Sequence, residues 1–198
     1  HQAWMGSFLP QEMEAVLGSD FQSQALAQSP YSVIANFRDR GPYRDHYDSL
    51  VYQYARLYLT GCVLVKVDRA SMACGLEVRA PLLDTDVIDF ACALPGHFKL
   101  RGMTGKYLLK KAARAWLPGD IIDRPKKGFG IPVGAWLRGP LKDFAHDLLL
   151  SDELRQTGYL NSDRVEELLM EHDRQIADHR KPLWTLLAFA LWYRHYGA

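Results

Sequence analysis

The chain has 198 residues, of which 48% are hydrophobic and 24% charged, and this is the composition of an ordinary globular protein rather than a disordered or collagen-like one. Twenty-four Lys and Arg residues against 23 Asp and Glu residues give a net charge of +1, which excludes a global field that attracts nucleic acid or anionic lipid. The longest apolar stretch, residues 183–193, is about half of the ~20 residues needed to cross a bilayer, so no transmembrane helix is predicted.

The cysteines and histidines form no metal-binding or redox pattern. Cys62, Cys74 and Cys92 have no C-x-x-C spacing, and we expect them to be small buried hydrophobes in a reducing, cytoplasmic compartment. The seven histidines include no H-E-x-x-H, so no metal site is predicted. The chain begins at His1 without a methionine or a signal peptide, and we therefore expect it to be part of a longer protein.

Hydrophobic periodicity predicts helices in the first half of the chain. One covers residues 11–17 and ends at Gly18, and an amphipathic helix covers residues 45–59. The apolar run 62–67 is too short for periodicity to distinguish a buried strand from a helical turn. Asp84 is a natural N-cap for a helix over residues 85–94.

The second half is also predicted to be helical. Thr104 is expected to cap a helix over residues 105–116. Further helices are predicted over residues 141–150, 163–178 and 183–196; the last has Pro182 in its first turn and is expected to lie at the centre of the core. At most one strand is plausible, so a doubly wound sheet is excluded and the fold class is mainly α.

The net charge conceals a strongly basic segment. Residues 99–127 hold nine basic and two acidic residues, which leaves the remainder of the chain acidic. We interpret one group within it as the solvated face of a helix, namely Lys106, Lys110, Lys111 and Arg114. Nucleic-acid binding through this segment is an alternative that predicts an affinity falling steeply with salt, but only Phe129 is available nearby for base stacking.

The basic loop R-P-K-K-G-F-G, residues 124–130, has two possible interpretations. Glycine lets a backbone approach a ligand closely, and a lysine in such a loop neutralises phosphate charge as a point cation. A basic surface turn without a ligand has the same composition. The residues alone leave both interpretations open.

Charges of alternating sign lie among apolar residues in segment 66–84. Because buried charges need partners, we expect an internal salt-bridge network at this corner of the fold. Glu77 and Arg79 are the two members of this network with the strongest case for a role in a site.

Three motifs together carry a resemblance to a known family. They are L-V-K-V-D-R-A-S-M-A at residues 64–73, L-E-V-R-A-P-L-L-D at 76–84, and R-P-K-K-G-F-G-I-P at 124–132. With W-L-R-G at 136–139 and L-W-T-L-L-A-F-A-L-W at 183–192, the chain resembles the glutamine-dependent asparagine synthetase family. The resemblance covers residues 58–196, so we divide the chain into a helical segment without a recognised motif, 1–57, and a synthetase-like part, 58–198.

The resemblance implies both a fold and a reaction. The fold is the helical C-terminal portion of an α/β adenine-nucleotide alpha-hydrolase-like (PP-loop) synthetase domain. The reaction activates the side-chain carboxylate of aspartate with ATP and Mg²⁺ as an acyl-adenylate, releasing pyrophosphate; ammonia from glutamine then forms asparagine and releases AMP. By the same resemblance, Lys126 is the principal charge-stabilising catalytic residue and Glu77 a second catalytic candidate, while Lys127, Gly128 and Arg124 are candidates for nucleotide binding.

Two parts of such an enzyme are absent from this sequence. The S-G-G-x-D-S pyrophosphate loop, the G-x-G-x-D-E stretch and the N-terminal glutaminase with its cysteine nucleophile have no counterpart here. We therefore expect the 198-residue chain alone to be inactive and to bind ATP weakly, because missing upstream sequence completes its site.

Two alternatives remain open. The chain could be a non-catalytic helical binding or docking module derived from this family, or part of an amidotransferase that acts on a sugar or secondary-metabolite carboxylate. The sequence does not show which carboxylate is amidated, and it leaves the oligomeric state open.

Overall fold

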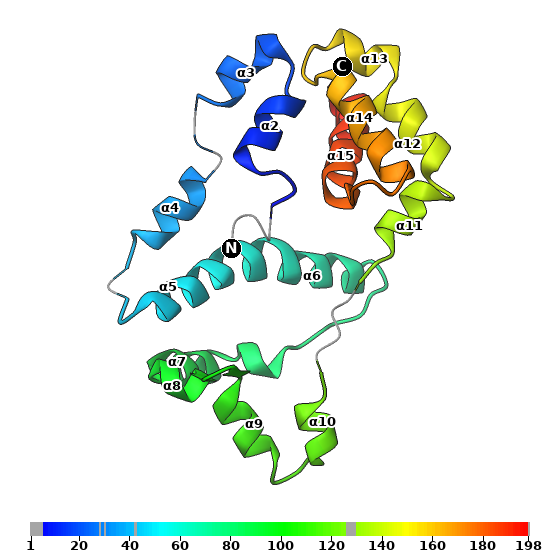
Figure 1. The fold of residues 1–198 in the computed structure, drawn as a ribbon. Coiled ribbons are helices and arrows are strands. Elements are labelled where there is room, and N and C mark those ends of the chain that lie inside the picture. The colour runs from blue at the N-terminus through cyan, green and yellow to red at the C-terminus, as the bar shows by residue number, and fades with distance from the viewer. Residues whose placement is uncertain (1–5, 28, 30, 42, 126–129, 198) are drawn as a thin grey trace. The chain divides into compact units, whose positions relative to one another are not determined.

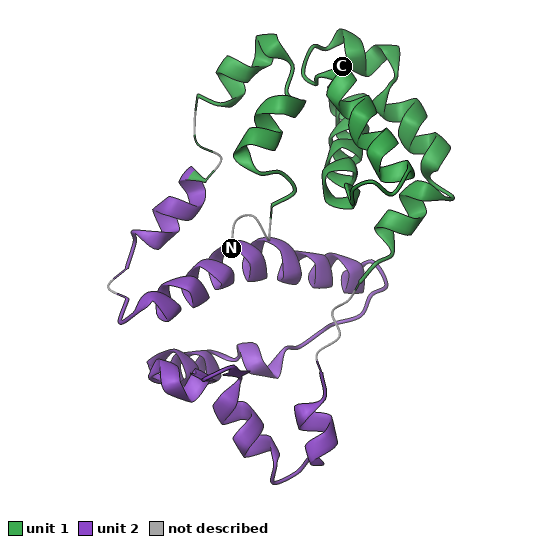
Figure 2. Ribbon diagram, viewed as in Figure 1, with its two compact units in different colours: residues 1–31, 128–198 green, residues 32–127 purple. Residues whose placement is uncertain are grey.

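A computed structural model describes residues 6–27, 29, 31–41, 43–125 and 130–197. The chain is mainly helical, as the sequence predicted (Figure 1). It divides into two compact units: unit 1 comprises residues 1–31 and 128–198, and unit 2 comprises residues 32–127 (Figure 2). Lys126, Lys127, Gly128 and Phe129 lie outside the described residues.

Unit 1 is a bundle of seven helices among the residues described. They are α2 (Pro10–Val16), α3 (Ser19–Ala25), α11 (Val133–Arg138), α12 (Lys142–Leu149), α13 (Asp152–Gln156), α14 (Ser162–Asp173) and α15 (Arg180–Tyr196). The buried core is formed largely by leucines, and the most deeply buried of them is Leu183 of α15, with 0% exposure. The predicted central role of this helix is therefore confirmed on its inner face, whereas Trp184, Leu191 and Trp192 on the same helix are exposed.

The N-terminal helices of unit 1 join the later ones through backbone pairing. Leu17 forms an isolated antiparallel bridge with Leu160, and the N–H of Gly18 donates to the carbonyl oxygen of Tyr159 at 2.9 Å. The Tyr159 ring lies edge-on to Phe21 of α3, with the two centroids 5.1 Å apart. Residues near the start of the chain are thus built into the same core as its last helix.

A buried histidine links three segments of unit 1. The side chain of His172 in α14 is 1% exposed, and its Nδ1 accepts a hydrogen bond from the backbone N–H of His179 at 3.1 Å. Because Nδ1 accepts, the ring proton lies on Nε2, which donates to the carbonyl oxygen of Gly134 in α11 at 3.2 Å. This ring is a structural connection between α11, α14 and the chain leading into α15.

Unit 2 begins with α4 (Ser32–Arg38) and one long continuous helix. That helix comprises α5 (His46–Gln53), a π-helical segment η1 (Tyr54–Leu64) and α6 (Val65–Met72). Its N-terminus confirms the helix predicted over residues 45–59, with Asp45 as N-cap, and the structure extends it to Met72. The unassigned apolar run 62–67 is therefore helical.

The remainder of unit 2 consists of short elements. They are η2 (Pro81–Leu83), α7 (Thr85–Ala93), α8 (Gly96–Lys99), β1 (Leu100–Arg101), β2 (Thr104–Gly105), α9 (Tyr107–Ala113) and α10 (Gly119–Asp123). The predicted cap at Asp84 is confirmed, because its side chain accepts from the N–H of Asp86. β1 and β2 pair as an antiparallel hairpin, so the expectation of at most one strand was wrong.

Two predicted helix ends differ from the structure. Thr104 does not cap a helix, because it lies in β2 opposite Arg101, and α9 begins only at Tyr107 with Lys106 at the N-cap position. The helix predicted to reach Asp178 ends at Asp173, because Gln175 takes a left-handed backbone conformation with φ of 57°. In the first case, the hairpin uses residues that periodicity had assigned to the helix.

Unit 2 has no buried apolar core among the residues described. Its only buried side chains there are Ser49 and Gln53, and large apolar residues are exposed, among them Leu76, Leu82, Phe90 and Trp116. The expectation that the three cysteines are buried was wrong, since Cys62, Cys74 and Cys92 all lie in this unit and are exposed.

The predicted buried salt-bridge network of segment 66–84 was also wrong. Its charged residues are exposed, and the ion pair found there among described residues joins Glu77 and Arg79. The apolar residues between these charged side chains do not shield them from solvent, because Met72 and Leu76 are themselves 58% and 60% exposed.

Candidate functional site

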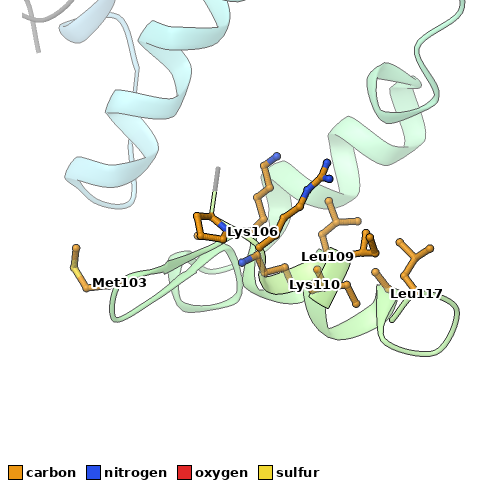
Figure 3. A pocket seen from close by; sticks show the side chains of 11 residues that line it. Met103, Lys106, Leu109, Lys110 and Leu117 are labelled. Carbon is orange, nitrogen blue, oxygen red and sulfur yellow. The ribbon is translucent and has the colours of Figure 1, made fainter. Parts of the chain in front are cut away.

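A large hollow lies between helices α9 and α10 of unit 2. It has a volume of about 1340 Å³, and Figure 3 shows the side chains that line it. Three of the lining side chains are cationic: Lys106, Lys110 and Arg124. The floor is apolar and is formed chiefly by Leu109, Ala113, Leu117, Ile121 and Ile122.

The β1–β2 hairpin sets the position of Lys106. Gly102, with φ of 57°, makes the turn of the hairpin, and the chain then enters α9 through Lys106, which has φ of 55°. This left-handed conformation costs an L-residue with a Cβ roughly 1–2 kcal/mol. Such backbone strain clusters at functional sites, where surrounding structure maintains it. Lys106 and Lys110 are one helical turn apart and line the same hollow.

The hollow carries uncompensated positive charge. Among the described residues, Lys106 and Arg124 form no ion pair. Lys110 Nζ lies 3.9 Å from Asp123 Oδ1, but the other oxygen of that carboxylate is held by Arg114 Nη2 at 2.6 Å. Cations at the rim and an apolar floor together fit an anionic ligand that has an apolar or aromatic body.

The structure describes only some of the predicted site residues. Arg124 lines the hollow, and with Pro125 it leads directly into residues 126–129. Lys126, Lys127 and Gly128, which belong to the predicted site, are outside the described residues, so their side chains are not placed.

Glu77 has a different environment. Its Oε1 accepts a hydrogen bond from Nε of Arg79 at 2.6 Å, and both side chains are exposed to solvent, at 69% and 88%. Glu77 does not line the α9–α10 hollow. Its predicted catalytic role stays a prediction.

Lys106 and Lys110 were not predicted from the sequence as candidate site residues. Their spacing indicates a solvated helix face, but in the structure they line the hollow together with Arg124. The sequence did contain a signal for these lysines. Lys106 and Lys110 share one helix face with Leu109 and Ala113, and a basic edge beside an apolar face fits an anion with an apolar body. Periodicity does not predict that α10 lies opposite this face.

Other kinds of site find little support in the part of the chain described. No group of three or more His, Cys, Asp or Glu side chains there is placed to hold a metal ion, so we assign no Mg²⁺ ligand to these residues. No helix there is long and apolar enough to span a membrane.

Comparison with known proteins decides the family. The family model described as Asparagine synthase matches residues 4–194, nearly the whole chain. The chain belongs to the asparagine synthase family. The resemblance drawn from the motifs is thereby confirmed, and the match begins well upstream of the first motif at residue 64.

The curated relatives are asparagine synthetases. Asparagine synthetase [glutamine-hydrolyzing] 1 of Bacillus subtilis (strain 168) is 32% identical over 157 residues, which is 79% of this chain and 24% of that protein. A putative asparagine synthetase [glutamine-hydrolyzing] of Mycobacterium tuberculosis (strain ATCC 25618 / H37Rv) is 39% identical over 138 residues, 69% of this chain and 21% of that protein. A probable one of Schizosaccharomyces pombe (strain 972 / ATCC 24843) is 34% identical over 124 residues, 57% of this chain and 22% of that protein.

The chain spans about a fifth to a quarter of the length of these relatives. No solved structure matches it. The mainly helical fold described above is therefore that of one region of an asparagine synthase, and the activity of the whole protein is a matter for proposal.

Proposed function

We propose that this chain is the part of an ATP-dependent, amide-forming ligase that supplies cationic side chains to the phosphates of the nucleotide. In this proposal the carboxylate is that of aspartate, ammonia comes from glutamine, and the products are asparagine, AMP and pyrophosphate. The observation that carries the proposal is the α9–α10 hollow, which is lined by Lys106 and Arg124, two cations without an ion pair among the described residues; Arg124 is also the first residue of the motif R-P-K-K-G-F-G-I-P.

The chemistry requires positive charge in two steps. The aspartate carboxylate attacks the α-phosphorus of ATP, the bond to the bridging oxygen breaks, and pyrophosphate leaves with the bonding electrons. Ammonia then adds to the acyl carbon, loses a proton, and AMP leaves as the C–O bond breaks. Negative charge develops on phosphate oxygens and then on the tetrahedral carbon's oxygen, and preorganised cations stabilise both.

We assign distinct tasks to the residues of the hollow. Lys106 and Arg124 bind phosphate oxygens of ATP, Lys110 adds charge beside them, and the apolar side chains around Leu109 and Ile122 contact the aromatic part of the nucleotide.

The loop and the Glu77 segment complete the proposed assignment. Lys126 stabilises the developing charge, while Lys127 and Gly128 shape the loop that presents it. Glu77 acts as a second catalytic group and is oriented by Arg79, with which it is paired in this structure. The parts of the enzyme that bind the remainder of the nucleotide and Mg²⁺ and that hydrolyse glutamine belong to other sequence.

A docking module without chemistry of its own is a second candidate. The exposed apolar side chains of unit 2, such as Phe90 and Trp116, favour it, because large exposed apolar areas mark surfaces that another protein part covers. This candidate predicts no loss of amide formation when cations of the hollow are removed.

The test uses the full polypeptide encoded by the gene that contains this chain. With ATP, Mg²⁺, aspartate and glutamine it should form asparagine and release pyrophosphate, and Lys126→Ala should lower turnover about 10²- to 10³-fold, as expected for one preorganised charge stabiliser. Arg155→Ala, which removes an exposed cation from α13, is the matched control and should leave turnover unchanged. Amide formation from another carboxylate, with aspartate inert, would support the sugar or secondary-metabolite alternative.

A further inference from the structure

The residue that leads into α9 adopts a backbone conformation that its surroundings must maintain. Lys106 has φ of 55° and ψ of 34°, a left-handed conformation that glycine or asparagine adopts at less cost. A lysine stays in it where the structure holds the chain on both sides. The contacts of the two neighbours of Lys106 therefore show what maintains it.

Both neighbours of Lys106 are attached to the same short strand. On one side, Gly105 in β2 pairs with Leu100 in β1. On the other side, the hydroxyl oxygen of Tyr107, the first residue of α9, accepts a hydrogen bond of 2.6 Å from Nη1 of Arg101, the next residue of β1. Lys106 lies between these two attachments, so the change of chain direction from the hairpin into α9 falls on it.

The contact between Arg101 and Tyr107 has two components. Besides the hydrogen bond, the guanidinium carbon of Arg101 lies 5.1 Å from the centre of the Tyr107 ring, so the cation is also attracted to the face of the ring. The planar guanidinium thus has both its distance and its orientation to the ring defined. This contact links β1 directly to the start of α9.

Neither partner of this contact belongs to the proposed nucleotide site. Lys106 and Lys110 line the α9–α10 hollow, whereas Arg101 and Tyr107 do not (Figure 3). An effect of Arg101 or Tyr107 on a ligand in the hollow is therefore exerted most directly through the backbone of Lys106. This is the property of a positioning residue.

We propose that Arg101 and Tyr107 form a clasp that positions Lys106. By joining β1 to the first residue of α9, the clasp keeps the Lys106 backbone left-handed and its ammonium group at the hollow. The clasp itself stands on the contacts above, whereas its consequence for ATP rests on the proposed function. Separate measurements test these two parts.

Thermal unfolding of the 198-residue chain tests the clasp without any activity. In the parent, Lys106→Gly relieves the left-handed conformation and should not lower the melting temperature. In Arg101→Gln the clasp is open and Lys106 relaxes to an ordinary conformation. There, Lys106→Gly only adds conformational entropy to the unfolded state and should lower the melting temperature. The same effect of Lys106→Gly in both backgrounds would overturn the proposal.

Kinetics of the full polypeptide test the positioning of Lys106. Arg101→Gln should lower kcat/KM for ATP in pyrophosphate release by about threefold or more, and Arg101→Lys, which retains a cation, should restore part of the loss. In a Lys106→Gly background, Arg101→Gln should cause no further loss, because it acts through a side chain that is already absent. The matched control is Arg40→Gln, which removes a guanidinium 4.8 Å from the centre of the Phe37 ring elsewhere in unit 2 and should leave kcat/KM unchanged.

The outcomes separate the clasp from the proposed function. Losses from Arg101→Gln and Lys106→Gly that simply add would overturn the positioning role, because a residue that only stabilises the fold or contacts ATP itself behaves in that way. An unchanged kcat/KM in a folded Arg101→Gln enzyme, with Lys106→Gly impaired, would overturn it too. If Lys106→Gly itself leaves kcat/KM unchanged, the proposed nucleotide role of the hollow fails, and the melting temperatures alone decide whether the clasp holds Lys106.

Discussion

Arg44 and Cys92 are joined by a hydrogen bond of 2.6 Å from the guanidinium Nη2 to the carbonyl oxygen, although 48 positions separate them in the sequence. The same guanidinium donates to the carbonyl oxygens of Ala93 and Leu94. Because the last carbonyls of a helix have no partner within it, Arg44 caps the C-terminus of α7. Asp48 orients this arginine at 2.7 Å and also binds Lys99 at 3.3 Å, immediately before the β1–β2 hairpin.

Replacing Arg44 should therefore destabilise unit 2. Arg44→Gln removes the charged donor from the carbonyls of Ala93 and of the C-cap residue Leu94, while Cys92 keeps a hydrogen bond from Lys99 at 3.3 Å, and we expect a loss of about 1–3 kcal/mol in the free energy of unfolding. Urea denaturation measures it. The control is Arg38→Gln, which breaks an exposed ion pair with Asp39 and should destabilise the chain less than Arg44→Gln does. Equal effects of the two substitutions would show that Arg44 is not a cap.

Asp173 should make unit 1 sensitive to acid. Burial acts to raise the pKa of this carboxyl, but hydrogen bonds from Lys142 and His146, both at 3.0 Å, outweigh it and hold the pKa below its usual value. A depressed pKa in the folded state contributes stability above the unfolded pKa of about 4, and that stability is lost as the pH falls through the lower, folded value.

The prediction is that Asp173→Asn lowers the melting temperature at pH 7, and that its difference from the parent shrinks as the pH falls below about 4. Thermal unfolding followed at a series of pH values measures both. A difference that stays constant down to pH 2 would contradict the assignment of this carboxylate as a stabilising charge.

The core of unit 1 depends on the inner face of α15. Leu183 is 0% exposed, so Leu183→Ala should cost about 2–5 kcal/mol through lost burial and the cavity left behind. Leu191 on the same helix is 46% exposed, and Leu191→Ala should cost much less. Chemical denaturation of the two variants compares them directly, and similar losses would mean that α15 does not bury the face described.

Two glycines should respond to alanine with opposite signs. A Cβ at Gly18 would lie 1.9 Å from the carbonyl oxygen of Gly158, so Gly18→Ala should force the two segments apart and cost about 1–3 kcal/mol. Gly61 lies in the long helix with nothing within 4 Å of its would-be Cβ, so Gly61→Ala should stabilise by up to about 1 kcal/mol. The sign of the shift in melting temperature distinguishes them, and a neutral Gly18→Ala would refute the close contact.

Local signals in the sequence identified much of the helical structure. The cap at Asp84 acts within a few residues, and the periodicity that predicted α2, α5, α12 and α15 is likewise a local signal. Where two local structures competed, the prediction was wrong: Thr104 is a good N-cap residue, but it pairs with Arg101 in a hairpin instead.

Burial and the site were harder to predict because they depend on distant contacts. Apolar character suggested that Cys92 is buried, but unit 2 has no buried apolar core among the described residues and Cys92 is exposed. Arg124 lines the hollow, but the role predicted for it from its motif stays a prediction, whereas Lys106 lines the hollow because α9 and α10 together form it. Periodicity predicts which face of a helix a residue occupies, but it does not predict which other element lies opposite that face.

Lys106→Gly gives the most direct test of the proposed site, because it removes the ammonium and also the cost of a left-handed backbone at φ of 55°. In the full polypeptide we expect this variant to be no less stable than its parent, while kcat/KM for ATP in pyrophosphate release falls at least tenfold. Gln175→Gly, which relieves the same kind of backbone conformation in unit 1, should leave kcat/KM unchanged. An unchanged kcat/KM in a folded Lys106→Gly enzyme would contradict the claim that this hollow binds the nucleotide.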